Sequence, residues 1–258
     1  MAKVAIEKEG PITVVAIDRF AEARNAVDPE TAVLLRDAFL AFDADASQSV
    51  AILTGRGSTF CAGYDLKVAA RPRSDAPLFD TKAPGPMGPT RHLLSKPVIA
   101  AIEGYAVAGG LELALWCDMR VASESAKFGV FCRRWGVPLV DGGTVRLPRL
   151  IGHSRALDMI LTGRIVAAQE AHAMGLANEV VSPGRHLERA LEYAEALARF
   201  PQETMLADRR AAIEGLGLTL ADGLSLEAQA GPEVFADAVA GAARFAGGEG
   251  RGGAGAGV

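Results

Sequence analysis

The chain has 258 residues, of which 50% are hydrophobic and 22% are charged, and its formal net charge is −4 at pH 7. This composition predicts one well-cored domain with a helical extension. The net negative charge argues against a nucleic-acid-binding protein, which would need a basic surface.

Signals for export, membrane insertion and disulfide formation are weak. The first ten residues, MAKVAIEKEG, place charges where a signal peptide needs an apolar core, and no uninterrupted apolar run reaches the roughly 18 residues of a membrane span. The three cysteines, Cys61, Cys117 and Cys132, are odd in number and widely spaced, which is typical of reduced thiols. We therefore expect a cytoplasmic protein with no membrane partner.

The N-terminal part predicts a hairpin followed by a helix. Residues 3–7 and 12–18 alternate or run apolar around a Gly-Pro pair, which indicates two paired strands. Asp28 has the character of an N-cap, because a proline follows it at the first helical position. An amphipathic helix is therefore expected over residues 29–43.

Two glycine turns follow buried strands, which are predicted over residues 50–54 and 98–102. At the first turn, Gly63 stands in GRGSTFCAGYDLK, where Tyr64 can offer its main-chain N–H. At the second, Gly109 opens an apolar helical segment whose first N–H groups have no partner inside the helix. Two such turns would aim two N–H groups at one point, which is how an oxyanion hole is made.

One carboxylate stands in the first turn of this second predicted helix. Glu112 lies among apolar neighbours, where burial would raise its pKa and the helix N-terminus would lower it. It is a candidate general acid or base. A first-turn glutamate also complements a helix dipole without any catalytic role, and a glycine pair also simply turns a chain, so these alternatives stay open here.

The rest of the chain predicts a loop, short strands and then helices. Residues 70–89 hold five prolines, which excludes a long helix or a central strand, and we expect a functional or mobile loop. Residues 119–122 and 127–129 predict short strands, and from about His153 the pattern is mostly helical. The histidines lack metal-ligand spacing, and no P-loop or G-x-G-x-x-G follows a strand, so no metal or nucleotide cofactor is expected.

Several segments together resemble a known family. FCAGYDLK and EGYAVAGGLELALWCDMRVAS are similar to the two signature regions of the crotonase, or enoyl-CoA hydratase/isomerase, superfamily, and KFG, GGTVRLPRLIG, LTGR and AAQEAHAMGLANEVV continue the resemblance in order. The resemblance implies an α/β crotonase fold, a spiral of ββα units with a C-terminal helical region. It also implies an acyl-CoA substrate, with coenzyme A as part of that substrate and no separate cofactor.

The same motifs assign residues to the site. By resemblance, the N–H groups of Tyr64 and Gly109 bind the thioester oxygen, and Glu112 is catalytic. For Arg24, a solvated loop charge is an equal alternative to a CoA contact. The substrate and CoA contacts that the resemblance implies are Ala23, Arg24, Ala62, Asp65, Leu66 and Cys132.

The resemblance, together with the composition and the local pattern of the C-terminal part, predicts the domain organisation and the assembly. Residues 1–195 are expected to form the spiral core with the acyl-CoA site, residues 196–246 a helical trimerisation region, and residues 247–258 a disordered glycine-rich tail. A homotrimer or a dimer of trimers is expected, and Pro232 is predicted to begin a helix. The loop over residues 70–89 is expected to shape the acyl pocket, with Leu78, Phe79, Met87 and Leu93 as candidate lining residues.

The second catalytic carboxylate of the family is missing from its expected position. Hydratases of the family have twelve residues between FG and GGT, with a glutamate third among them; residues 130–141 give the same count, with Cys132 third. A thiol is a poor substitute, because its unperturbed pKa is about 8.5 and it is a weak hydrogen-bond donor. Asp141 is the candidate replacement, and an equal alternative makes it the N-cap of a helix that begins at Gly142.

These residues favour an enzyme that hydrates trans-2-enoyl-CoA to 3-hydroxyacyl-CoA, with Glu112 and Asp141 handling the protons. The enzymatic alternative is an enoyl-CoA isomerase or another enolate-forming lyase with one carboxylate, which Cys132 favours. The third interpretation is a non-catalytic acyl-CoA-binding protein. Glu112 argues against it, because a pure binding protein has no need of a buried carboxylate.

Overall fold

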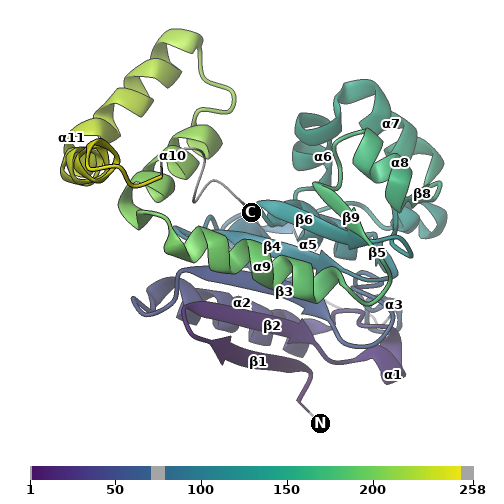
Figure 1. Ribbon diagram of the computed structural model, residues 1–258. Coiled ribbons are helices and arrows are strands. Elements are labelled where there is room, and N and C mark those ends of the chain that lie inside the picture. Colours follow the sequence, from purple (N-terminus) through teal and green to yellow (C-terminus); the bar gives the residue numbers. More distant parts are fainter. Residues whose placement is uncertain (1, 71–78, 251–258) are drawn as a thin grey trace. The chain divides into compact units, whose positions relative to one another are not determined.

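The computed structural model describes residues 2–70 and 79–250 (Figure 1). The chain divides into two compact units, residues 1–194 and 195–258. The first unit is mixed α/β, and the described part of the second is helical. Residues 71–78 of the predicted loop and residues 251–258 of the predicted tail lie outside the described residues.

A six-stranded sheet forms the centre of the first unit, in the order β1-β2-β3-β4-β6-β9. β1 and β2 make the predicted antiparallel hairpin, and the later neighbours are parallel. β2, β3 and β4 are buried along their whole length, which explains why their sequences are continuous apolar runs. The strands are β1 (Val4–Glu9), β2 (Ile12–Ile17), β3 (Val50–Gly55), β4 (Val98–Ile102), β6 (Met119–Ser123) and β9 (Glu179–Val181).

A second, three-stranded sheet has the order β5-β7-β8. Its strands are β5 (Tyr105–Val107), β7 (Lys127–Gly129) and β8 (Val166–Ala167). The strand β7 was predicted from the sequence, whereas a turn was predicted for residues 105–107, where β5 lies. β5 forms because its main chain pairs in parallel with β7, a partner about 20 residues further along the chain that the local pattern does not reveal.

Helix α2 (Pro29–Ala44) begins as predicted. The Asp28 side chain accepts the N–H of Thr31 at 2.8 Å, and Pro29 occupies the first helical position. The apolar face of α2, which includes Phe39 and Phe42, is buried in the core. The other helical elements of this unit are α1 (Phe20–Ala23), α3 (Leu66–Ala69), η1 (Pro89–Arg91), α5 (Gly109–Trp116), η2 (Phe131–Trp135), α6 (Gly143–Ile151), α7 (His153–Thr162) and α8 (Ala168–Ala173).

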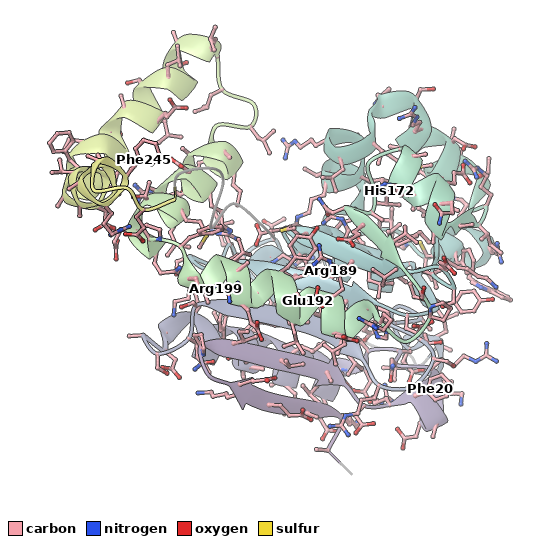
Figure 2. The ribbon with its side chains drawn as sticks, in the orientation of Figure 1. Phe20, His172, Arg189, Glu192, Arg199 and Phe245 are labelled. Carbon is pink, nitrogen blue, oxygen red and sulfur yellow. The ribbon has the colours of Figure 1, made fainter. Side chains whose placement is uncertain are left out.

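Helix α9 (His186–Arg199) begins in the first unit. Figure 2 shows Arg189 and Glu192 on this helix, and their ion pair measures 2.6 Å between Nη1 and Oε2. Arg189 also pairs with Glu179 of β9 at 3.0 Å. These pairs face solvent, so each contributes at most about 1 kcal/mol while it ties α9 to the last strand of the sheet.

The described part of the second unit contains helices α10 (Gln202–Glu214) and α11 (Leu220–Ala246). The prediction that Pro232 begins a helix is wrong, because Pro232 lies inside α11, which begins at Leu220. The helix continues through the proline at the loss of one main-chain hydrogen bond. Within the described ranges, no helix is both long enough and apolar enough to cross a lipid bilayer.

Candidate active site

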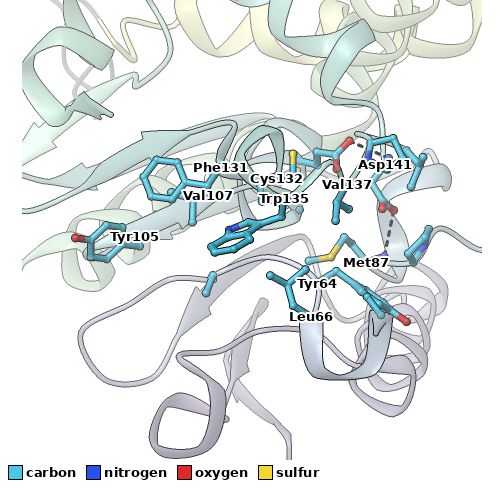
Figure 3. Close-up of a pocket in the computed structure, with 18 of the residues that line it drawn as sticks. Tyr64, Leu66, Met87, Tyr105, Val107, Phe131, Cys132, Trp135, Val137 and Asp141 are labelled. Atoms are coloured by element: carbon cyan, nitrogen blue, oxygen red, sulfur yellow. Dashed lines mark hydrogen bonds between the residues drawn. The ribbon is translucent and has the colours of Figure 1, made fainter. Parts of the chain in front are cut away.

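A pocket of about 560 Å³ opens in the first unit (Figure 3). Its wall is mostly apolar and aromatic, and it contains two carboxylates, Glu112 and Asp141. The apolar and aromatic lining residues are Ala62, Tyr64, Leu66, Ala69, Phe79, Pro86, Met87, Tyr105, Val107, Ala108, Phe131, Trp135, Val137, Pro138 and Val140.

The two glycine turns predicted from the sequence lie against each other in this pocket. Cys61 and Ala106 pair in an isolated parallel bridge, which brings the two turns together. Gly63 has a φ of +102°, and a Cβ at this position would lie 3.1 Å from the nitrogen of Gly109. Only glycine therefore lets the turn before Tyr64 approach the start of α5 this closely.

The main chain is strained where α5 begins. Ala108 has a φ of +53° and a ψ of −125°, which costs a non-glycine residue on the order of 1–3 kcal/mol. A hydrogen bond of 2.9 Å from its N–H to the Gly129 carbonyl of β7 holds this conformation. Gly109 is the first residue of α5, so its N–H has no acceptor within the helix. Tyr64 and Gly109, the two predicted N–H donors, both line the pocket.

Glu112 is a buried carboxylate on α5, with 3% of its surface exposed. Its Oε1 accepts the N–H of Asp141 at 2.9 Å and the N–H of Gly143 at 2.8 Å. Burial, and then the negative charge of Asp141, raise the pKa of Glu112 to about 7, although the two main-chain donors act in the opposite direction. Glu112 can therefore both accept and release a proton near neutral pH.

Asp141 is the second buried carboxylate, with 2% of its surface exposed. Its Oδ1 accepts the N–H of Met87 at 3.1 Å and the hydroxyl of Thr90. Burial raises the pKa of Asp141, whereas the Thr90 hydroxyl, the Met87 N–H and the charges of Arg91 and Arg146 lower it. Figure 3 shows the Asp141 carboxylate beside Met87 at one end of the pocket.

The alternative role of Asp141 as a helix N-cap is wrong. The N-cap of α6 is Gly142, with a φ of +99°, and no side chain of the described residues caps this helix. The reason is that the Asp141 carboxylate turns toward the Met87 N–H and the Thr90 hydroxyl instead. The carboxylate therefore remains on the pocket wall.

Cys132 lies in η2 on the pocket wall and is nearly buried. Burial, and then the charge of Glu112, raise the pKa of its thiol, so the thiol stays protonated at neutral pH. The position at which family hydratases carry their second glutamate is thus uncharged in this protein.

Three more of the predicted substrate contacts lie on the pocket wall: Arg24, Ala62 and Leu66. Arg24 is the C-cap of α1 with a φ of +50°, and its carbonyl accepts the N–H of Ala62 at 3.2 Å. This hydrogen bond holds the segment around Arg24 beside the first glycine turn.

Ala23 and Asp65 are not among the described lining residues of the pocket. Asp65 is the N-cap of α3 and accepts the N–H of Lys67 at 3.0 Å, and its Oδ2 pairs with Nη2 of Arg19 at 3.3 Å. The Asp65 side chain therefore has a structural role, and a CoA contact by Ala23 or Asp65 stays a prediction.

The predicted acyl-pocket residues divide in the same way. Phe79 and Met87 line the pocket, whereas Leu93 does not and is 58% exposed. Leu78 lies outside the described residues.

Thr90 and Arg146 are the site residues that the sequence reasoning missed. Thr90 follows the proline-rich stretch and has no neighbour in the sequence that suggests a role. Arg146 stands within GGTVRLPRLIG, and an arginine in an amphipathic helix is usually solvent-exposed. Only the folded chain brings both residues to Asp141, Thr90 through its hydroxyl and Arg146 through a guanidinium that bridges the carbonyls of Asp141 and Thr90.

Within residues 2–70 and 79–250, no cluster of three or more His, Cys, Asp or Glu side chains has the arrangement that a metal ion needs.

The chain belongs to the enoyl-CoA hydratase/isomerase family of enzymes, the crotonase superfamily indicated by its motifs, because the sequence profile of that family matches residues 7–247.

The chain is also similar to individual enzymes of this family. The chain is 38% identical over 237 residues to an enoyl-CoA hydratase of Mycobacterium tuberculosis, covering 89% of this chain and 87% of that protein. It is 36% identical over 222 residues to the (E)-benzylidenesuccinyl-CoA hydratase of Thauera aromatica, covering 86% of each. The crystal structure of an enoyl-CoA hydratase from Mycobacterium marinum matches with a TM-score of 0.87 and 36% identity over 95% of both chains, which confirms the predicted crotonase fold.

Proposed function

We propose that this protein catalyses the addition of water to the double bond of a trans-2-enoyl-CoA, giving a 3-hydroxyacyl-CoA. Family membership supports an acyl-CoA substrate, and the relatives named as hydratases support hydration. The observation that carries the proposal is Glu112, whose carboxyl group has a pKa of about 7 on the wall of an apolar pocket that also holds the two glycine turns.

The first proposed step polarises the thioester. The carbonyl oxygen of the substrate accepts hydrogen bonds from the N–H groups of Tyr64 and Gly109, which stabilise the negative charge that forms on it in the enolate. One oxyanion donor of this kind is worth about 3 kcal/mol of barrier lowering. The close approach of Gly63 to the Gly109 nitrogen supports a shared position for the two donors.

The second proposed step moves protons between water and the substrate. Glu112 and Asp141 interact electrostatically, and burial raises the pKa of both carboxyl groups. In the proposed cycle one of the two is protonated and the other is ionised. The carboxylate of the pair takes a proton from water as the water oxygen bonds to C3, and the carboxylic acid gives its proton to C2. One water is consumed, and the pair again holds one proton at the end of the cycle.

Cys132 favours a second candidate function, an enoyl-CoA isomerase or another enolate-forming lyase. In such an enzyme one carboxylate removes a proton from one carbon and returns it to another, so a second acid is not required. A non-catalytic acyl-CoA-binding protein is less well supported, because a buried Glu112 with a raised pKa would destabilise a protein that had no use for it.

The test follows the conjugated thioester absorbance of purified protein with crotonyl-CoA and with a longer trans-2-enoyl-CoA. Loss of absorbance with formation of the 3-hydroxyacyl product is expected, and Asp141→Asn should slow it strongly. No loss with either substrate while both still bind would overturn the hydratase proposal. Conversion of a 3-enoyl-CoA under the same conditions would then establish the isomerase.

We also propose the remaining features of the system. CoA lies along Arg24, Ala62 and Leu66, with Ala23 and Asp65 as further predicted contacts, and the reaction uses no metal or redox cofactor.

Residues 196–246 mediate assembly into a homotrimer or a dimer of trimers in the cytoplasm. Sedimentation equilibrium tests the assembly, and dialysis against a chelator, with an unchanged rate expected, tests the cofactor proposal.

A further inference from the structure

The segment between Gly85 and Arg91 forms a cradle around the carboxylate of Asp141. The N–H of Met87 and the hydroxyl of Thr90 both donate to Oδ1, and Thr90 is buried. A Cβ at Gly85 would collide with both Oδ1 of Asp141 and Oγ1 of Thr90. A side chain at position 85 would therefore displace the carboxylate.

A single guanidinium holds the two sides of this cradle together. Nη1 of Arg146 donates to the carbonyl of Asp141 at 2.9 Å, and Nη2 donates to the carbonyl of Thr90 at 2.7 Å. Arg146 therefore bridges the main chains of the same two residues whose side chains hydrogen-bond to each other. Its two main-chain contacts tie η1 to the residue Asp141 that precedes α6.

We propose that Thr90 is a positioning residue for Asp141, and that Arg146 holds Thr90 and Asp141 at the separation that their hydrogen bond needs. The inference rests on the proposed role of Asp141 as the second acid. Thr90 holds Oδ1 in place, which leaves Oδ2 for the reaction.

The charges around Asp141 make the hydroxyl important. Glu112 on α5 repels the Asp141 carboxylate, whereas Arg91 on η1 and Arg146 on α6 attract it. Both arginines donate to main-chain carbonyls, Arg91 to that of Val140 and Arg146 to those of Asp141 and Thr90. The two donors to Oδ1, the Thr90 hydroxyl and the Met87 N–H, therefore set its orientation.

The first test compares Thr90→Val, which keeps the shape and removes the hydroxyl, with Thr90→Ser, which keeps the hydroxyl. Thr90→Val is expected to lower kcat roughly 10- to 100-fold, the effect of losing one hydrogen bond to a charged group, with KM nearly unchanged. Thr90→Ser should restore most of the rate. In an Asp141→Asn background, Thr90→Val should have no further effect, because the two residues act as one unit.

The second test does not depend on turnover. Protein labelled with ¹³C at aspartate carboxyl carbons is titrated by NMR, and the Asp141 signal is identified by its loss in Asp141→Asn. Thr90→Val should raise the Asp141 midpoint by roughly one pH unit, because the lost donor favoured the ionised form, and Thr90→Ser should not.

The two tests separate the inference from the proposed function. A midpoint that moves in an enzyme without hydratase activity would support the positioning of Asp141 and refute only hydration. A Thr90→Val protein that melts like the wild type, with an unmoved midpoint, would overturn the positioning role. An equal loss of rate in the Asp141→Asn background would also overturn it.

Discussion

Replacing Glu112 by glutamine is expected to abolish most of the activity and, at alkaline pH, to stabilise the fold. The amide oxygen can still accept the two main-chain N–H groups that contact Oε1 at 2.8 and 2.9 Å, so the local structure should survive. The amide cannot exchange a proton, and kcat should fall by roughly 10²- to 10⁴-fold, the usual contribution of a general acid or base.

The effect on stability follows from the pKa of Glu112, which rises from an ordinary value of 4.5 to about 7 in the fold. Between these pH values the folded protein binds more protons than the unfolded chain, so stability falls as pH rises. Each pH unit of this difference is worth about 1.4 kcal/mol, and the penalty reaches about 3 kcal/mol above pH 7. Below pH 4.5 the carboxyl is protonated in both states, and the penalty disappears.

The assay combines hydration kinetics with urea unfolding at several pH values between 4.5 and 8. The stability of Glu112→Gln relative to the wild type should increase across this range by about 3 kcal/mol. Glu9→Gln on the exposed side of β1 is the matched control and should change neither quantity. A variant that retains the wild-type kcat, or whose relative stability is independent of pH, would refute the reasoning.

Three further substitutions test other parts of the pocket. Gly63→Ala should lower kcat by roughly 10²- to 10³-fold in the hydration assay, because its Cβ would lie 3.1 Å from the Gly109 nitrogen at a φ of +102°. Cys132→Ala should keep kcat within about fivefold, since the buried thiol stays protonated; a hundredfold loss would instead assign proton transfer to the thiol. Trp135→Ala should leave the melting temperature nearly unchanged, because Trp135 is 70% exposed, while KM for long acyl chains rises roughly tenfold; an unchanged KM would exclude Trp135 from acyl binding.

The local sequence determined most of the elements around the site. Continuous apolar runs indicated the buried strands β3 and β4, and the Asp-Pro pair at residues 28–29 marked the start of α2. Gly63 and Gly109 marked the two turns, since close main-chain approach requires glycine. These features are legible because each depends on residues a few positions apart.

The direction in which the pKa of Glu112 shifts, and the contacts of Asp141, could be known only from the tertiary structure. From the sequence, burial and the helix N-terminus pull the pKa of Glu112 in opposite directions, and the balance depends on Asp141, which lies 29 residues away in the chain. The Asp141 carboxylate accepts in turn the hydroxyl of Thr90, 51 residues away, and Arg146 of α6 donates to the carbonyl of Thr90 across 56 residues of chain. Such contacts between distant segments leave no periodic pattern in the chain, because they arise only when the packed core brings those segments together.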